Sequence, residues 1–437
     1  MFGSGNVGAV YVRARPALLP WWRLARAAIL NKAADLYEEN AGQFYAMLTR
    51  EAGKGQPDCE GELREAVDFL RYYAARIDPA MAARGRLVCI SPWNFPLAIF
   101  TGQIAGSLAA GNAVLAKPAE QTPLIAHFAV SLMLKAGIPA SALQLLPGDC
   151  ATVGAALTSD PRVDGVVFTG STDTAQIIRR SMAANLAPGA PLIAETGGLN
   201  AMIVDSTALP EQAVRDIIAS SFQSAGQRCS ALRCLYVQED VADHILQMLF
   251  GAMDALQMGD PWLLSTDVGP VIDAEAARDI RAYVSKARRE RRVLHELRAP
   301  EPGHFVAPVA VEVGSINDLE REIFGPVLST VRAQTYEEAL KLAMDHEYGN
   351  GTAIFTRDGD TARDFAHRIN VGMIGINVPI PVPLAYHTFG GWKKSGFGDL
   401  NQHGPDGFRF YTRTKTITSR WPSGIRTGGE FNFKAMD

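Results

Sequence analysis

One cysteine of this chain stands in a setting that suits covalent catalysis. Cys229 follows Ala225-Gly-Gln-Arg228, so small residues and an arginine lie directly before it. The thiolate is the reactive form of cysteine, and a neighbouring cation or the positive end of a helix lowers the pKa of a thiol. Glu195 lies upstream and is a candidate base for the water that would release an acyl group from the sulfur. Since a lone cysteine is more often a small buried side chain, the assignment depends on the residues that accompany it.

Composition limits the classes of protein to consider. The chain has 437 residues, too many for one ordinary core, so two or three domains are expected. A net charge of −4 gives no basic surface for nucleic acid, and polar residues interrupt every long apolar run, which argues against a membrane span. Eight histidines and five cysteines form no metal-binding motif, so no metal is expected. The first residues do not read as a secretory signal, and we predict a cytoplasmic protein.

Short apolar runs alternate with helical patterns through the first half of the chain. The spacing leaves room for one helix between successive strands, which is typical of a parallel sheet covered on both faces. We predict strands over 86–90, 113–116, 143–146, 165–168 and 191–194, and helices over about 95–110, 123–136, 150–159 and 172–184.

Further elements flank this region. Helical periodicity runs over 21–54 and 60–76, and a second βα region follows Glu195, with strands over 201–204 and 233–237 and a helix over 209–225. A charged helix is predicted over 278–298, and an edge strand over 408–421. An exposed edge strand is a liability unless another chain covers it, so a homo-oligomer is expected.

One glycine motif is rejected. Gly3-Ser-Gly5-Asn-Val-Gly8 matches the pattern of dinucleotide-binding loops, but only two residues precede it, so no strand can lead into the turn. The position about 20 residues further on, where such a loop needs an acid for the ribose, is Ala28.

Several short segments together give a strong signal. They are Pro92-Trp-Asn-Phe-Pro96, Lys117-Pro-Ala-Glu120, Phe168-Thr-Gly-Ser171, Glu195-Thr-Gly-Gly198 and the segment around Cys229. In combination they resemble the NAD(P)-dependent aldehyde dehydrogenase family, from about Trp21 to Trp421. The resemblance implies an α/β fold with a Rossmann-like parallel sheet. Its domains would be an NAD-binding domain over 1–196, a catalytic domain over 197–385, and a return segment with a β oligomerisation element over 386–437.

Aldehyde oxidation through sulfur assigns roles to three residues. Attack by Cys229 on the aldehyde creates an oxyanion, and the amide of Asn94 is the candidate donor to that charge. Loss of hydride leaves a thioester, which water activated by Glu195 would hydrolyse. In isolation Asn94 also reads as a turn residue and Glu195 as a salt-bridged carboxylate, so the roles depend on the resemblance.

The expected cofactor is NAD. Lys117 and Glu120 follow a predicted strand, where ligands bind in doubly wound sheets, and the resemblance implies that they hold an adenine ribose. If Glu120 binds the free 2′-hydroxyl of this ribose, NAD is favoured over NADP, because the 2′-phosphate of NADP would meet the like charge of the Glu120 carboxylate. The remaining candidate cofactor residues are Ser91, Pro92, Trp93, Gly148, Phe168, Thr169, Gly170, Ser171, Thr196, Gly197, Glu322 and Phe324.

The substrate signal is divided between two subfamilies. Residues from about 21 to 324 resemble the dehydrogenase domain of proline utilization A, which oxidises L-glutamate γ-semialdehyde. Residues from about 348 to 424 resemble methylmalonate-semialdehyde dehydrogenase, which passes the acyl group to coenzyme A and carries an amide where this chain has Glu195. The carboxylate favours hydrolysis, and Phe95 and Ser230 match positions that line the glutamate-semialdehyde pocket. A truncated, non-enzymatic relative is the alternative of a different class.

Two departures from the first subfamily are visible. The glycine- and serine-rich loop that would anchor the substrate carboxylate is replaced by residues 379–394, with Lys393, Lys394 and Ser395 as possible substitutes. Few residues stand between Asp78 and Gly85, where the family has a β-hairpin arm used in subunit association.

Overall fold

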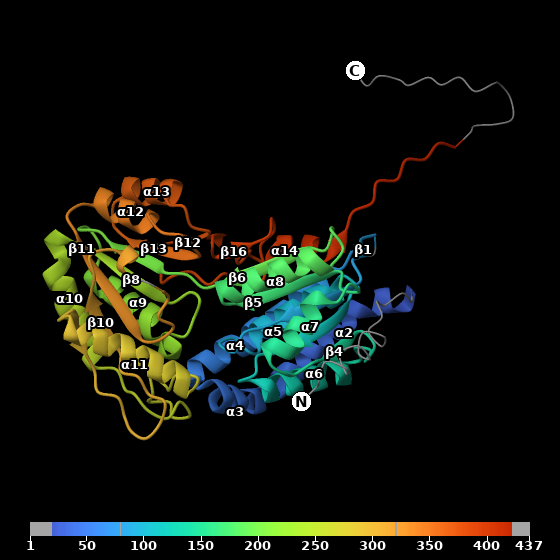
Figure 1. The fold of residues 1–437 in the computed structure, drawn as a ribbon, viewed down its shortest axis with the longest axis horizontal. Helices are drawn as coiled ribbons and strands as arrows, with labels where there is room; N and C mark the ends of the chain where they lie inside the picture. Colours follow the sequence, from blue (N-terminus) through green and yellow to red (C-terminus); the bar gives the residue numbers. More distant parts are fainter. Residues whose placement is uncertain (1–19, 79, 320, 422–437) are drawn as a thin grey trace, which may run out of the picture.

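Two mostly parallel β-sheets organise the molecule (Figure 1). The computed structural model describes residues 20–78, 80–319 and 321–421. The glycine motif over 3–8 lies outside the described residues. The first sheet has the strand order β16-β6-β5-β2-β3-β4, and the second has the order β14-β13-β7-β8-β11-β10-β9. The chain passes from the first sheet to the second between β6 (Leu192–Thr196) and β7 (Asn200–Val204).

The first sheet contains the strands predicted from the apolar runs. They are β2 (Arg86–Ile90), β3 (Ala113–Lys117), β4 (Leu143–Leu145), β5 (Gly165–Gly170) and β6, all mutually parallel where they pair. These five predictions are confirmed to within two residues at each end, β5 and β6 extending furthest. All five residues of β3 are buried, because helices cover both faces of a parallel sheet.

Alternate residues of β2 divide the packing between those two faces. Leu87 and Cys89 join a core formed with α2 (Pro20–Glu39), α3 (Ala41–Ala52), α4 (Gln56–Ala75), α5 (Ala98–Ala109) and α6 (Pro123–Ala136). Val88 and Ile90 point to the opposite core, with α7 (Ala155–Ser159) and α8 (Thr172–Asn185). This alternation is the period of two of a β-strand.

The second sheet is formed by strands from the half of the chain that contains Cys229. Its strands are β7, β8 (Leu232–Gln238), β9 (Val293–Glu296), β10 (Val309–Glu312), β11 (Val327–Ala333), β13 (Gly351–Phe355) and β14 (Met373–Ile376), and only β9 pairs antiparallel. Packed with it are α9 (Pro210–Phe222), α10 (Glu239–Asp254), α11 (Ala274–Arg289), α12 (Tyr336–Met344) and α13 (Gly359–Arg368).

The C-terminal part of the chain returns to the first sheet, as its red ribbon in Figure 1 shows. Strand β16 (Gly396–Phe397) pairs antiparallel with β6 and sets Gly396 opposite Glu195. Helix α14 (Gly404–Phe410) and β17 (Thr412–Arg413) follow, and β17 pairs with β1 (Ala82–Ala83). Two further short strands, β12 (Tyr348–Gly349) and β15 (Trp392–Lys393), pair with each other.

Three predicted elements differ from the structure. The helical region over 21–54 is two helices, which meet at Asn40. The prediction of a charged helix over 278–298 is wrong at its C-terminal end. Helix α11 stops at Arg289, because Arg291 adopts a left-handed conformation with a φ of 57° and the chain then enters β9. The edge strand over 408–421 is also wrong: α14 occupies its start, and only Thr412–Arg413 forms a strand. In the described part of the chain, no helix is long and apolar enough to span a membrane.

Candidate active site

The segment before Cys229 has an unusual backbone. After α9, a single turn over Gln223–Gly226 places Ser224 and Ala225 in left-handed conformations, with φ values of 54° and 53°. Such conformations are costly for residues with a Cβ, and they persist where the surroundings enforce them. At Gly226 a Cβ would lie 2.3 Å from the Gly325 carbonyl oxygen, so this position needs glycine.

Two amides hold the main chain of Cys229. Asn200 donates from Nδ2 to the Cys229 carbonyl at 2.6 Å and to the Ala231 carbonyl at 2.8 Å. Asn350 donates to the same Cys229 carbonyl at 3.2 Å. Because these asparagines lie at the starts of β7 and β13, the cysteine is fixed to the end of the second sheet.

One cavity brings together six of the residues selected from the sequence. They come from both halves of the chain and are Cys229, Glu195, Phe95, Ser230, Thr169 and Thr196. The other lining residues are Glu65, Phe69, Ile99, Val382, Pro383, Leu384, Phe389, Gln402 and His403. A cysteine and a carboxylate in one mostly apolar cavity can perform nucleophilic attack followed by base-assisted hydrolysis.

The thiol of Cys229 does not have the lowered pKa that the sequence suggested. Burial raises its pKa to about 12, and the carboxylates of Glu322 and Glu195 act in the same direction. Arg228 opposes this shift, but its guanidinium is engaged with the Gln223 side chain at 2.9 Å and the Ala219 carbonyl at 2.9 Å. No helix begins at Cys229, so the expected lowering by a cation or a helix end is wrong here. The thiol therefore needs a base.

Glu195 is one of two carboxyl-bearing residues that share the cavity with Cys229. It lies on β6, its side chain is 3% exposed, and burial raises its pKa well above the usual range. The Gly391 N–H donates to Oε2 at 3.1 Å, and the Gln402 N–H also favours the charged form. Both partners belong to the C-terminal segment, which also pairs with β6. A carboxylate with a raised pKa is a stronger proton acceptor once it is ionised.

Asn94 lies in the loop between β2 and α5. The residue is 8% exposed, and it does not line the cavity that contains Cys229, although the neighbouring Phe95 does. The expected role of Asn94 as donor to an oxyanion therefore stays a prediction.

A second group of residues follows the carboxyl ends of the first sheet. Lys117 is buried, and its Nζ lies 3.9 Å from a carboxylate oxygen of the more exposed Glu120. Glu120 also accepts a hydrogen bond of 2.6 Å from the Cys150 N–H. Gly148 nearby has a φ of 153°, which favours glycine. A lysine and a carboxylate side by side can bind neighbouring hydroxyl groups.

The strand β5 ends in residues with two different surroundings. Ser171 caps α8, accepting from the Thr174 N–H at 3.2 Å, and at Gly170 a Cβ would meet the Phe168 ring at 2.5 Å. Thr169 instead donates to Gln402 Oε1 at 2.9 Å and lines the catalytic cavity. The α8 N-terminus can therefore approach a phosphate, whereas the Thr169 side chain faces the reaction site.

The remaining candidate cofactor residues lie around the Cys229 segment. Glu322 pairs with the buried Arg233 at 3.3 Å, and the Phe324 ring lies 5.5 Å from that of Trp93, centroid to centroid. A Cβ at Gly197 would lie 2.0 Å from a Glu322 oxygen. Three other candidate cofactor residues have different surroundings. The Thr196 hydroxyl donates to the Lys394 carbonyl, and Pro92 is buried. The Ser91 hydroxyl is buried and has no hydrogen-bond partner among the described residues.

Sequence reasoning missed several residues that line the cavity. Glu65 is partly exposed to the cavity, yet burial by surrounding protein atoms raises its pKa to about 8, assisted by the charge of Glu62. His403 is 5% exposed, has a φ of 68°, and leaves Nδ1 without a partner. Burial lowers the pKa of His403 to about 3. They come from α4 and from the loop before α14, and no local pattern links those segments to Cys229.

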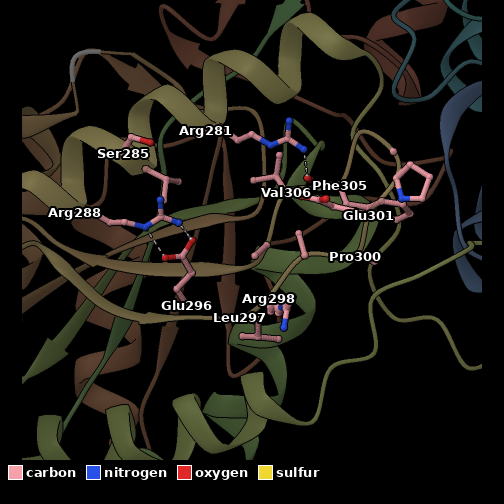
Figure 2. Close-up of a pocket in the computed structure, with 15 residues that line it drawn as sticks. Arg281, Ser285, Arg288, Glu296, Leu297, Arg298, Pro300, Glu301, Phe305 and Val306 are labelled. Atoms are coloured by element: carbon pink, nitrogen blue, oxygen red, sulfur yellow. Dashed lines mark hydrogen bonds and ion pairs between the residues drawn. The ribbon is translucent and has the colours of Figure 1, made fainter.

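A larger cavity of about 990 Å³ lies elsewhere, between α11 and residues 296–307 (Figure 2). Figure 2 shows two of its arginines turned toward local partners: Arg288 pairs with Glu296, and Arg281 donates to the Phe305 carbonyl at 2.8 Å. No cysteine lines it. Size alone therefore does not identify the reaction site, and we assign the chemistry to the cavity that contains Cys229 and Glu195.

Comparison with known proteins gives a consistent result. Residues 5–417 match the aldehyde dehydrogenase family. The bifunctional protein PutA of Klebsiella aerogenes is 49% identical over 85% of this chain, and this chain spans 30% of its length. The malonate-semialdehyde dehydrogenase of Pseudomonas aeruginosa is 35% identical over 94% of this chain and 88% of that protein. A crystal structure from Sinorhizobium meliloti, described as a methylmalonate-semialdehyde dehydrogenase complexed with NAD, superposes with a TM-score of 0.90. It is 37% identical over 97% of this chain and 92% of its own.

Proposed function

The chain belongs to the aldehyde dehydrogenase family, and on this premise we propose that it oxidises L-glutamate γ-semialdehyde to L-glutamate with NAD. The observation that carries the proposal is the single cavity lined by Cys229, Glu195 and Ser230. The predicted nucleophile and the predicted base share it, and Glu195 is a carboxylate rather than an amide. Hydrolysis to a free acid follows from that carboxylate.

The residues divide the reaction into two stages. Glu195 takes the proton of the Cys229 thiol, and the sulfur adds to the aldehyde carbon while Asn94 donates a hydrogen bond to the oxygen. Bound NAD would supply the hydride acceptor, and loss of hydride from the carbon leaves a thioester on Cys229. Glu195 first releases the thiol proton to solvent and can then remove a proton from water. The resulting hydroxide adds to the thioester carbon, and collapse of this adduct expels the Cys229 thiolate and frees the acid.

The residues along the first sheet fit NAD. Ser91 Oγ is buried and lacks a partner, which suits a hydrogen bond to a ligand. Lys117 and Glu120 would hold the adenine ribose, Ser171 would lie near the pyrophosphate, and Glu322 would hold the nicotinamide ribose.

NAD is expected to give a higher kcat/KM than NADP, because a 2′-phosphate would meet the Glu120 carboxylate. Glu120→Gln removes that charge and should narrow the preference by on the order of tenfold, the size of a like-charge contact of a few ångströms. Glu60→Gln, an exposed change on α4, is the control. Steady-state kinetics with both cofactors measure the ratio. A preference for NADP in the unaltered protein would contradict the ribose role of Glu120.

Glu65 supports an amino acid semialdehyde as the substrate. It is a carboxyl group at the wall of an otherwise mostly apolar cavity, and its pKa of about 8 lets it ionise when a cation approaches. The ammonium group of glutamate semialdehyde is such a cation. Malonate and methylmalonate semialdehydes carry no cation, so Glu65 offers them no such charge pair.

One observation favours malonate or methylmalonate semialdehyde as a second candidate. Val382, Pro383 and Leu384 line the catalytic cavity, and they belong to the segment that resembles methylmalonate-semialdehyde dehydrogenase. If this segment sets the chemistry, coenzyme A rather than water receives the acyl group.

A panel of aldehydes separates the two candidates. NADH formation is followed with glutamate semialdehyde, methylmalonate semialdehyde and propanal, each with and without coenzyme A. We expect the highest kcat/KM with glutamate semialdehyde and no acceleration by coenzyme A. A requirement for coenzyme A, with an acyl-CoA as product, would refute the glutamate-semialdehyde assignment and leave the family assignment intact.

A further inference from the structure

Helix α4 presents three acids at the spacing i, i+4 and i+7, which places them on one face. They are Asp58, Glu62 and Glu65, and each reaches a different part of the catalytic centre. Glu65 lines the cavity itself. The other two bind the loops that carry the nucleophile and the oxyanion donor.

Asp58 binds the segment that leads to Cys229. Ser224 Oγ donates to Asp58 Oδ2 at 2.7 Å, and the Gln223 side-chain amide donates to Oδ1 at 2.5 Å. Gln223 Oε1 in turn accepts from Arg228, the residue directly before the cysteine. Asp58 therefore fixes the turn in which Ser224 is left-handed, and this turn sets the direction in which the chain approaches Cys229.

Glu62 binds the segment that carries Asn94. Its Oε2 accepts from the Leu97 and Ala98 N–H groups, at 3.1 and 3.0 Å, and so holds the start of α5. Its Oε1 pairs with Lys54 at 2.8 Å, and the two side chains are 1% and 3% exposed. The Lys54 ammonium also lies 4.3 Å from the centroid of the Phe95 ring. Both sides of Asn94 in the loop are thereby tied to α4 or to the turn before it.

We propose that α4 sets the distance between Cys229 and Asn94, with Asp58 and Glu62 as positioning residues for aldehyde oxidation. The proposal rests on the proposed function, which makes Cys229 the nucleophile and Asn94 the oxyanion donor. The two loops belong to different sheets, and α4 contacts both. An oxyanion donor acts only within about 2.7–3.1 Å of the developing charge, and a displacement of about 1 Å can lower a rate by about 100-fold.

Asp58→Asn tests the nucleophile side. The amide can accept one of the two hydrogen bonds, but its NH₂ group faces a donor, so the turn should relax. Turnover of propanal, which makes no charged contacts, is expected to fall by at least about tenfold, while iodoacetamide should label Cys229 faster. Trypsin cuts after Arg228 and Arg233 and so separates Cys229 from Cys234, which lets mass spectrometry quantify each thiol. Glu60→Gln, on the same helix but exposed, is the control and should change neither rate.

Slower turnover of propanal together with faster labelling of Cys229 would identify Asp58 as a positioning residue. Unchanged turnover and unchanged labelling in Asp58→Asn would overturn the proposal. Labelling of the buried Cys89 and Cys234 that rises in step with Cys229 would also overturn it, because the effect would then be a general loss of packing. Cys59 lies next to Asp58 and is not used as a reporter.

A double-mutant cycle gives the second measurement. Ser224→Ala removes the same contact from the other partner, so Asp58→Asn combined with Ser224→Ala should change Cys229 labelling little more than either change alone. Additive effects would refute the contact as the cause. Glu62→Gln should lower turnover of propanal without raising the KM for NAD; if this variant does not fold, the Asp58 measurements decide the proposal. Labelling of Cys229 by iodoacetamide does not require turnover. If the unaltered protein oxidised no aldehyde, the proposed function would be refuted, but labelling would still show whether Asp58 positions Cys229.

Discussion

Replacing Cys229 with alanine is expected to lower aldehyde oxidation by on the order of 10⁴-fold or more, because the covalent step loses its only sulfur atom. NAD should still bind, since the residues expected to hold it lie along the first sheet and around Glu322. NADH absorbance measures turnover, and quenching of protein fluorescence by NAD measures binding.

Cys234→Ala is the matched control. Cys234 lies five residues further on, within β8, and is fully buried in the core of the second sheet. Its replacement removes a small apolar group but no reacting atom, so much of the activity should remain. Comparable losses in both variants would show that Cys229 is not the sole nucleophile.

Replacing Glu195 with glutamine should separate the two stages of the reaction. The amide keeps the size of the side chain but cannot take a proton from water. The first turnover should still produce NADH at high pH, where the thiol ionises without help, and the protein should then stall as a thioester. General-base assistance contributes about 10²- to 10⁴-fold, so steady-state turnover should fall by that factor while the burst persists.

Rapid mixing measures the burst, and intact-protein mass spectrometry detects the acyl group on Cys229. Addition of coenzyme A to the stalled variant is informative, because thiolysis needs no deprotonation of water. Loss of the burst even at high pH, where the Cys229 thiol ionises without a base, would show that Glu195 does more than remove protons, which would contradict its assignment as the base of both stages.

The elements that were predicted well are those whose sequences carry a local signal. Strand β2 was predicted over 86–90 and α6 over 123–136, and both match the structure, because apolar runs and a proline at the helix start mark their limits. The tail over 408–421 has the composition of a strand, but strand pairing depends on a partner, and β1 offers only two residues. Propensity alone therefore predicted the wrong structure there.

The site residues likewise divide into those that stand in a short sequence motif and those that do not. Cys229, Glu195, Asn94 and Phe95 stand in short motifs, and three of them line one cavity. Glu65, Gln402 and His403 stand in no motif, and their presence in that cavity results from packing of α4 and the C-terminal segment against both sheets. The pKa of Cys229 could not be predicted, since burial outweighs the neighbouring arginine.

The pairing of β16 with β6 has a consequence for the order in which this protein becomes competent during synthesis. Asn94 and Glu195 have both been translated by the time Cys229 is added, yet the partners of Glu195 arrive with Gly391 and Gln402, and Gly396 closes the edge of β6. A nascent chain that carries the complete trio therefore still exposes β6 as an open, apolar strand edge. Such edges attract other chains, and long-range pairings form slowly. The ribosome must add more than 160 further residues before that edge is covered, so this interval is when the chain most needs a chaperone.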